Sequence, residues 1–230
     1  MILTADIGNT RIKRAYFEGD RMVAPGKPER AIVCATGHYD PATLDLGTDR
    51  VHLLSSESRL PIAIDYATPR TLGPDRIAAA CGAWKLRQES GWRGGCIIVD
   101  AGTCITVDWL DAGGVYRGGA ILPGLEMKFH ALHTFTEKLP LLKLTDCPTQ
   151  PLTGRSTEES MQAGVLTATR FALEGFVAHY RAADPEAHLL LTGGDADRLA
   201  SLGLEASGLC SVEPFLTMIG LNEILKINEK

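Results

Sequence analysis

The 230-residue chain lacks the features that direct a protein to a membrane or to nucleic acid. No apolar stretch approaches the length of about 20 residues that a membrane-spanning helix needs. The N-terminus enters a strand-like run at once, without the basic and apolar regions of a signal peptide. The formal net charge is −5 and no run of Lys and Arg stands out, so neither a nucleic acid nor an anionic membrane is an expected partner.

Cysteine pairs with metal-ligand spacing are also absent. The chain has six cysteines, but no two of them form a C-x-x-C motif. Cys96 and Cys104 fall in expected strands, where a thiol behaves as a small buried side chain. His130 and His133 lie close together on an expected helix but have no evident carboxylate partner. We therefore expect reduced thiols in a cytoplasmic protein rather than a disulfide framework or a zinc site.

Two short segments of the chain repeat one arrangement. Asp6-Ile7-Gly8-Asn9-Thr10 and Asp100-Ala101-Gly102-Thr103-Cys104 each place an Asp after an apolar run, a Gly in the turn and a Thr just beyond it. The Gly lets the backbone approach a ligand closely, and the turn N–H groups and the Thr hydroxyl can face phosphate oxygens. The Asp can hold a metal ion or its waters. One copy is typical of a hairpin, but two indicate a duplicated domain with a nucleotide between its halves.

Strand and helix patterns also occur twice. The first third of the chain reads as strands separated by turns, followed by an Ala-rich helix, and the second half restarts with strands at Cys96. Strands followed by helices, twice over, predict an α/β fold of two similar halves. The expected strands are Ile2–Asp6, Arg11–Phe17, Ala31–Ala35, Val51–Leu54, Ile62–Tyr66, Cys96–Val99, Ile105–Leu110, Val115–Leu122 and His188–Leu191. The expected helices are Asp75–Arg87, Leu125–Thr134, Thr157–Ala182, one from Ala196, and Pro214–Asn228.

A third glycine turn, Thr192-Gly193-Gly194-Asp195, joins an apolar strand to a helix. Two glycines let a flat group lie against bare backbone, which fits an adenosine contact. Alone, such a pair usually makes only a tight connection. No G-x-x-x-x-G-K-[ST] motif occurs, so the phosphate site is not of the Walker type.

A fourth segment, Gly73-Pro74-Asp75-Arg76, opens the Ala-rich helix. Asp75 can be a helix cap beside a solvated Arg76. It can also be a carboxylate that takes a proton from a substrate hydroxyl, beside a guanidinium that holds a carboxylate or a phosphate.

The three glycine turns resemble those of the acetate and sugar kinase, heat-shock chaperone and actin superfamily. Together with the fourth segment they resemble the type III pantothenate kinases over nearly the whole chain. The matching motifs are DIGNTRIK at 6–13, GPDR at 73–76, VDAGT at 99–103, GGAILPG at 118–124, STEESMQAG at 156–164 and LTGGDA at 191–196. The stretch between Lys13 and Tyr66 looks short and carries few such motifs.

The resemblance implies a duplicated RNase H-like, actin-like ATPase fold, with two similar domains of mixed sheets flanked by helices. Residues 1–93 are then the domain with the first phosphate loop and the GPDR segment. Residues 94–230 are the domain with the second phosphate loop and the adenosine loop.

The resemblance also implies an activity and its site. The activity is ATP-dependent phosphorylation of pantothenate to 4'-phosphopantothenate, the first step of coenzyme A biosynthesis, with Mg²⁺ and a monovalent cation, K⁺ or NH₄⁺, in a cytoplasmic homodimer. Asp75 matches the proton acceptor, Asp100 the cation ligand and Thr103 an ATP contact. The first phosphate loop comprises Asp6, Ile7, Gly8, Asn9, Thr10, Arg11, Ile12 and Lys13. The pantothenate group comprises Tyr66, Gly73, Pro74, Asp75, Arg76 and Thr157.

Two alternatives remain open on the sequence. One is a catalytically silent, nucleotide-binding accessory or regulatory homologue of the same fold. The intact set of Asp6, Asp75, Arg76, Asp100 and Thr103 weighs against it. The other is a kinase or phosphohydrolase of the same superfamily that acts on a sugar, acetate or polyphosphate. The chain of 230 residues leaves little room for the inserted subdomains of sugar kinases.

Overall fold

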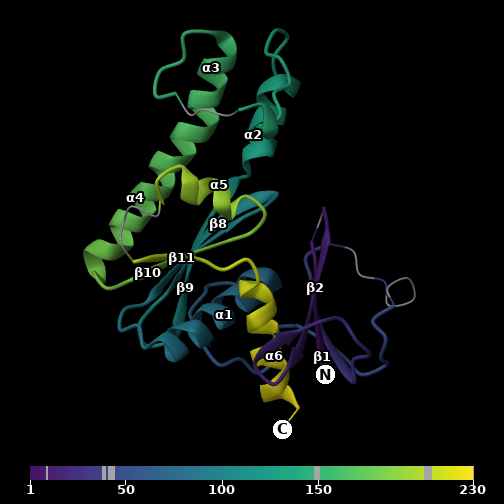
Figure 1. Cartoon of the computed structure of the whole chain (residues 1–230). Helices are drawn as coiled ribbons and strands as arrows, with labels where there is room; N and C mark the ends of the chain where they lie inside the picture. The colour runs from purple at the N-terminus through teal and green to yellow at the C-terminus, as the bar shows by residue number, and fades with distance from the viewer. Residues whose placement is uncertain (9, 38–39, 41–44, 148–150, 205–208, 230) are drawn as a thin grey trace. The chain divides into compact units, whose positions relative to one another are not determined.

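The computed structural model in Figure 1 describes residues 1–8, 10–37, 40, 45–147, 151–204 and 209–229. The chain forms two compact units. The first unit consists of Met1–Ile98, Asp108–Gly118 and Phe215–Lys230, and the second consists of Val99–Val107 and Gly119–Pro214. Each unit is therefore built from separate stretches of the sequence.

The first sheet has five strands in the order β3-β2-β1-β4-β5. The central strand β1 (Ile2–Ile7) pairs antiparallel with β2 (Ile12–Glu18) and parallel with β4 (Arg30–Ala35). The edge strands are β3 (Arg21–Val23) and β5 (Val51–Leu53). All residues of β1 except Asp6 are buried, as suits a strand in the middle of the sheet, and Asp6 comes near its carboxyl end.

The second sheet has six strands in the order β11-β10-β7-β8-β9-β6. These strands are β6 (Ala63–Ile64), β7 (Cys96–Ala101), β8 (Cys104–Leu110), β9 (Val115–Pro123), β10 (His188–Thr192) and β11 (Cys210–Val212). Read from the other edge and without β6, the order is β9-β8-β7-β10-β11. If these five strands are numbered 1 to 5 by their place in the chain, this order is 3-2-1-4-5, which is also the order in the first sheet. The predicted duplication is therefore present in the topology, with β6 as an addition at one edge.

Helix α1 (Pro74–Ser90) follows the first six strands of the chain, whereas in the second half helices and the strands β10 and β11 alternate after β9 (Figure 1). The other helices are α2 (Leu125–Thr134), α3 (Thr157–Gln162), α4 (Ala168–Ala183), α5 (Ala196–Ser201) and α6 (Leu216–Asn228). Short 3₁₀ turns cover Pro69–Thr71 and Leu144–Asp146, and a π-helical turn over Ala163–Thr167 connects α3 to α4.

Helices α1 and α6 of the first unit pack together without side chains between them at two positions. A Cβ atom on Gly82 would overlap the carbonyl oxygen of Leu216, and one on Gly220 would overlap the carbonyl oxygen of Ala78. Glycine is needed at both positions because the two backbones are in contact. This contact fixes α1, the helix that begins with the GPDR segment.

The expected elements correspond to those of the structure, with three kinds of difference. The strand expected over Ile62–Tyr66 is reduced to β6 (Ala63–Ile64), which pairs with β9 in the second sheet. The strands β3 and β11, each of three residues, have no counterpart in the expected pattern. The helix expected over Thr157–Ala182 is one helical run, but the π-helical turn interrupts its α-helical hydrogen bonding. Such turns are often found at functional sites.

Within the described residues, no helix combines the length and apolar character that crossing a membrane requires. All six cysteines lie in the described part of the chain, and no disulfide joins any two of them.

Candidate functional site

The start of α1 holds the Asp75 carboxylate in one place. Gly73 is the N-cap residue and Pro74 occupies the first helical position. One oxygen of Asp75 accepts a hydrogen bond from the backbone N–H of Arg76 at 2.9 Å. A Cβ atom on Gly73 would lie 2.5 Å from that same oxygen, so the carboxylate rests against bare backbone. Gly73 therefore makes the space that Asp75 occupies.

Burial shapes the acidity of Asp75. Desolvation raises the pKa of this carboxyl above its usual value of 3.8, and the charge of Asp108 raises it further. The backbone hydrogen bond at Arg76 and the Arg76 charge act in the opposite direction without cancelling the rise. A carboxylate with a raised pKa is a better proton acceptor than an ordinary surface carboxylate.

Asp6 lies at the end of β1, where Lys13 is its partner in the register of β2. Burial raises the pKa of Asp6, and the negative charge of Asp75 raises it too, while Lys13 lowers it. The two carboxyls therefore lie within electrostatic range of each other. Oδ1 of Asp6 is buried and makes no hydrogen bond in the structure, which is costly unless a ligand satisfies it.

A backbone hydrogen bond closes the turn after Asp6, the segment expected to be the first phosphate loop. The N–H of Gly8 donates to the carbonyl of Arg11 at 3.1 Å, which closes the turn. A Cβ atom on Gly37 would lie 3.1 Å from the carbonyl oxygen of Gly8, so this segment packs close behind the loop. The side chains of Thr10 and Arg11 are exposed, while Asn9 lies outside the described residues.

Arg76 is buried at the same end of α1 and is held by a carboxylate that sequence reasoning missed. Its Nε donates to Asp108 at 3.0 Å, and its Nη2 donates to the same carboxylate at 2.5 Å. The hydroxyl of Tyr116 donates to Asp108 at 2.6 Å. Burial alone would lower the pKa of Arg76, but its bonds to Asp108, helped by Tyr116 and Tyr66, raise that pKa instead.

Tyr66 and Tyr116 form the aromatic part of this group. Their ring centroids are 6.2 Å apart, and the guanidinium carbon of Arg76 lies 5.9 Å from the centre of the Tyr116 ring. Gly118 has a φ of 91° and faces the ring of Tyr66. The first unit thus brings together Asp6, Tyr66, Gly73, Pro74, Asp75 and Arg76, and adds Asp108 and Tyr116.

The second unit gathers three of the sequence motifs around the turn that follows β7. A Cβ atom on Gly193, whose φ is 93°, would overlap Ala101 and would lie 2.5 Å from a carboxylate oxygen of Asp100. A Cβ atom on Gly124 would lie 2.5 Å from the carbonyl oxygen of Thr103. The turn is therefore enclosed by bare backbone from two distant motifs, an arrangement suited to a flat or phosphorylated ligand.

Hydrogen bonds reinforce this arrangement. The N–H of Asp195 donates to the carbonyl of Ala101 at 3.0 Å, and the N–H of Gly124 donates to the carbonyl of Thr103 at 3.1 Å. The second phosphate loop and the adenosine loop of the sequence analysis are thus in direct contact within this unit.

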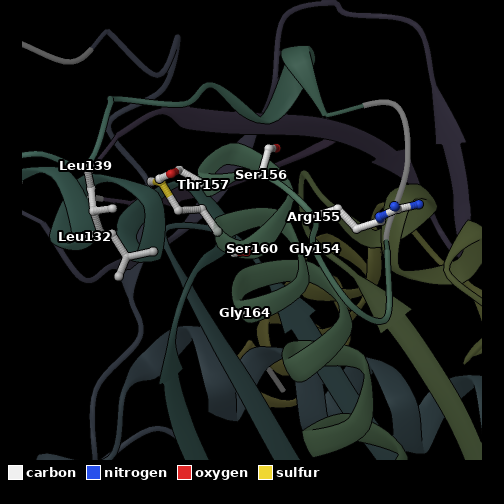
Figure 2. Close-up of a pocket in the computed structure, with 9 residues that line it drawn as sticks. Leu132, Leu139, Gly154, Arg155, Ser156, Thr157, Ser160 and Gly164 are labelled. Atoms are coloured by element: carbon white, nitrogen blue, oxygen red, sulfur yellow. The ribbon is translucent and has the colours of Figure 1, made fainter.

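Thr157 lies at the start of α3 beside a pocket of about 780 Å³ (Figure 2). The helix cap is Ser156, whose hydroxyl accepts the N–H of Glu159 at 3.2 Å, and a Glu159 oxygen accepts the N–H of Arg155 at 2.6 Å. Thr157 is therefore not the capping residue. Across the pocket stand Leu132 of α2 and Leu139.

The comparisons with known proteins agree with one another. The family model of type III pantothenate kinases matches residues 38–179. A type III pantothenate kinase from Cytophaga hutchinsonii is 39% identical over 99% of this chain and 100% of its own length. One from Christiangramia forsetii is 40% identical over 100% of this chain and 99% of its own length.

Solved structures match in fold. A protein from Campylobacter jejuni assigned to the Baf family of transcriptional activators aligns with a TM-score of 0.65 and 21% identity, over 99% of this chain and 98% of its own. A protein from Porphyromonas gingivalis assigned as an N-acetylglucosamine kinase aligns over the whole of both chains, with a TM-score of 0.50 and 12% identity. These likenesses concern the fold alone, and they agree with the predicted duplicated α/β architecture.

Proposed function

The chain belongs to the type III pantothenate kinase family, and from this premise we propose how its own residues transfer the terminal phosphoryl group of ATP to the terminal hydroxyl of pantothenate. The observation that carries the proposal is the Asp75 carboxylate, fixed at the start of α1 with a raised pKa. Phosphoryl transfer depends mostly on positioning and charge neutralisation, so one well-placed base is enough for an alcohol substrate.

Asp75 is the general base in this proposal. It accepts the proton of the pantothenate hydroxyl as that oxygen bonds to the phosphorus, and the bond to the leaving ADP oxygen breaks. Its raised pKa supports this role because the carboxylate then holds the transferred proton more strongly. The Asp6 carboxyl nearby contributes to the same negative surroundings.

The first phosphate loop, Asp6 to Lys13, binds the ATP phosphates. Asp6 is the residue that fits a hydrated Mg²⁺, since its buried Oδ1 has no hydrogen-bond partner in the structure. Mg²⁺ is usually held by one or two carboxylates together with waters and substrate phosphates, and it neutralises phosphate charge when bound. Lys13, whose charge acts on Asp6, adds positive charge on the same side.

Asp100 and Thr103 also bind the nucleotide in this proposal. A carboxylate oxygen of Asp100 and the carbonyl oxygen of Ala101 both lie against Gly193, so two hard oxygen donors face one place. This donor set fits a monovalent cation, K⁺ or NH₄⁺, which would offset phosphate charge. Thr103 contacts ATP through the same turn.

Tyr66, Gly73, Pro74, Arg76 and Thr157 bind pantothenate in this proposal. The buried guanidinium of Arg76 and the ring of Tyr66 lie together with Asp75 in the first unit. Thr157 supports the proposal because Ser156 has taken over the capping role, so the Thr157 hydroxyl beside the pocket is available for a ligand.

We also propose that the chain acts as a homodimer in the cytoplasm. Large apolar side chains are exposed on α2, on α4 and in the segment that connects them, and a second copy of the chain would cover such groups at an interface. They are Met127, Phe135, Leu141, Leu152 and Phe171. The cysteines, none of which forms a disulfide in the structure, suit a reducing compartment.

One assay tests the activity. ADP release is measured with pantothenate, glucose, acetate or no acceptor, in the presence of Mg²⁺ and of K⁺, NH₄⁺ or Na⁺. We expect ADP release to require pantothenate and to be faster with K⁺ or NH₄⁺ than with Na⁺. ADP release that does not depend on pantothenate under any cation would contradict the proposed activity. Turnover that is unchanged without K⁺ and NH₄⁺ would contradict only the role of Asp100.

A further inference from the structure

Asp108 and Tyr116 contact Arg76 from β8 and β9, and neither belongs to a motif of the sequence analysis. Asp108 is 1% exposed on β8, and Tyr116 is 0% exposed on β9. Both residues and Arg76 lie in the first unit. A charged side chain this deeply buried needs a partner, and Arg76 provides it.

The hydrogen bonds fix which face of the guanidinium is used. Asp108 accepts from Nε at 3.0 Å and from Nη2 at 2.5 Å, so one edge of the Arg76 fork is fully engaged. A guanidinium has five N–H donors in a rigid plane. The two N–H groups of Nη1 and one N–H of Nη2 therefore remain for a ligand.

Tyr116 holds the carboxylate in turn. Its hydroxyl donates to Oδ1 of Asp108 at 2.6 Å, and its ring lies under the Arg76 guanidinium at 5.9 Å. The three side chains thus form a chain of contacts in the order Tyr116, Asp108, Arg76. A buried ion pair usually gives little net stability compared with apolar side chains of the same shape. Its value here lies in orientation.

We propose that Asp108 and Tyr116 are positioning residues for pantothenate binding, which act by holding the Arg76 guanidinium in one orientation. This inference rests on the proposed function, in which Arg76 belongs to the pantothenate group. A rigid fork loses less freedom when it binds a planar carboxylate or amide than a mobile one does. Loss of the support should therefore weaken pantothenate binding and leave ATP binding unchanged.

The test compares KM for pantothenate and KM for ATP in single and double variants. Tyr116→Phe keeps the ring and removes only the hydroxyl that reaches Asp108. We expect the pantothenate KM to rise about threefold to tenfold, the effect of one lost hydrogen bond. Asp108→Asn keeps the shape and removes the charge, and we expect a rise of at least about tenfold. Tyr16→Phe, at another partly buried tyrosine of the first unit, is the matched control and should change neither KM.

The double variant Arg76→Ala/Tyr116→Phe separates positioning from general structure. If Tyr116 acts through Arg76, the double variant has the same pantothenate KM as Arg76→Ala alone. Multiplied effects of the two changes, or an unchanged pantothenate KM in Tyr116→Phe, would overturn the inference. If Arg76→Ala itself leaves the pantothenate KM unchanged, the proposed function of Arg76 fails instead. Because Tyr116→Phe removes no charge, it answers the question even if Asp108→Asn does not fold.

Discussion

At the scale of single residues, the site of the first unit brings together carboxyls that disfavour one another's ionisation. Asp6, Asp75 and Asp108 are three carboxyls in a partly buried region, and the charges of Asp75 and Asp108 each raise the pKa of a neighbouring carboxyl. Arg76 compensates part of this charge through its bonds to Asp108. Burial and like charges of this kind cost stability, and they are typical of sites where a carboxylate takes part in chemistry.

Replacing Asp75 by Asn should separate activity from stability. The amide keeps the shape but cannot accept the proton, so we expect kcat to fall by about 10²–10⁴-fold while ATP binding persists. The measurements are steady-state kinetics and nucleotide binding on the same preparation. A kcat close to that of the unaltered protein would contradict the assignment of Asp75 as the base.

The raised pKa of Asp75 has a definite sign for pH dependence. The folded state binds the proton more readily than the unfolded state, so the contribution of Asp75 to the free energy of unfolding falls as the pH rises above 3.8 toward the raised value. The Asn variant has no carboxyl at this position, so its free energy of unfolding does not undergo this decrease. We therefore expect its Tm at pH 7 to equal or exceed that of the unaltered protein, and the two Tm values to converge in acid. A clearly lower Tm at pH 7 would show that the charged Asp75 is stabilising.

Gly73→Ala should move the base without unfolding the protein. The backbone of Gly73 has a φ of −56°, which Ala adopts easily, but a Cβ atom there would lie 2.5 Å from the Asp75 oxygen. The flexible carboxylate can shift, so the expected change in Tm is small while kcat falls about tenfold or more. Gly91→Ala at the other end of α1 is a control with open space around it, although its φ of 68° will lower Tm. An unaltered kcat in Gly73→Ala would show that the position of Asp75 tolerates the shift.

The residues of the site differ in how far the sequence reveals them. Asp75 follows Pro74 at the start of a helix, and Asp6 and Asp100 each stand two residues before a Gly near the end of a strand, so a turn pattern marks all three. Asp108 lies inside an apolar strand, and its partner Arg76 is distant in the sequence. The one available signal was the charge itself, because a carboxylate between Val107 and Trp109 must find a partner when the strand is buried.

At the scale of elements, the duplicated order of strands follows from the repeated strand and turn pattern, whereas short or irregular elements do not. The three-residue strands β3 and β11 are too short for a periodic signal. The π-helical turn of Ala163–Thr167 has no period of its own, and its residues fit an α-helix equally well. Long-range packing determines such elements, so the sequence pattern could not predict them.

The start of α3 offers a test of Thr157. Because Ser156 is the cap, Thr157→Ala should leave Tm unchanged and raise the KM for pantothenate about threefold to tenfold, with little effect on the KM for ATP. Ser156→Ala is the matched variant, which should lose about 1 kcal/mol of stability. Thermal melts and steady-state kinetics of both variants distinguish a substrate contact of Thr157 from a structural role. A lower Tm with an unchanged pantothenate KM in Thr157→Ala would assign it a structural role only.

At the scale of the whole molecule, the exposed apolar side chains of the second unit predict association. Phe135, at the end of α2, is 85% exposed. We expect Phe135→Asp to convert a homodimer into monomers at micromolar concentration, as measured by sedimentation velocity. Met22→Asp, at an exposed apolar residue of the first unit, should leave the dimer intact. A monomeric unaltered protein, or a dimer that persists in Phe135→Asp, would contradict this interface.

The backbone contact between α1 and α6 has a consequence for folding during synthesis on the ribosome. The helix that presents Asp75 cannot complete its packing until residues 215–230 have been synthesised, because Gly82 and Gly220 meet across that contact. At about 5–20 residues per second, synthesis from Ile98 to residue 230 takes roughly 7–26 s. During that interval the apolar face of α1 that α6 later covers is open to chaperones. The nascent chain should therefore fix the position of Asp75 only after α6 has been made, although Asp75 is translated in the first half.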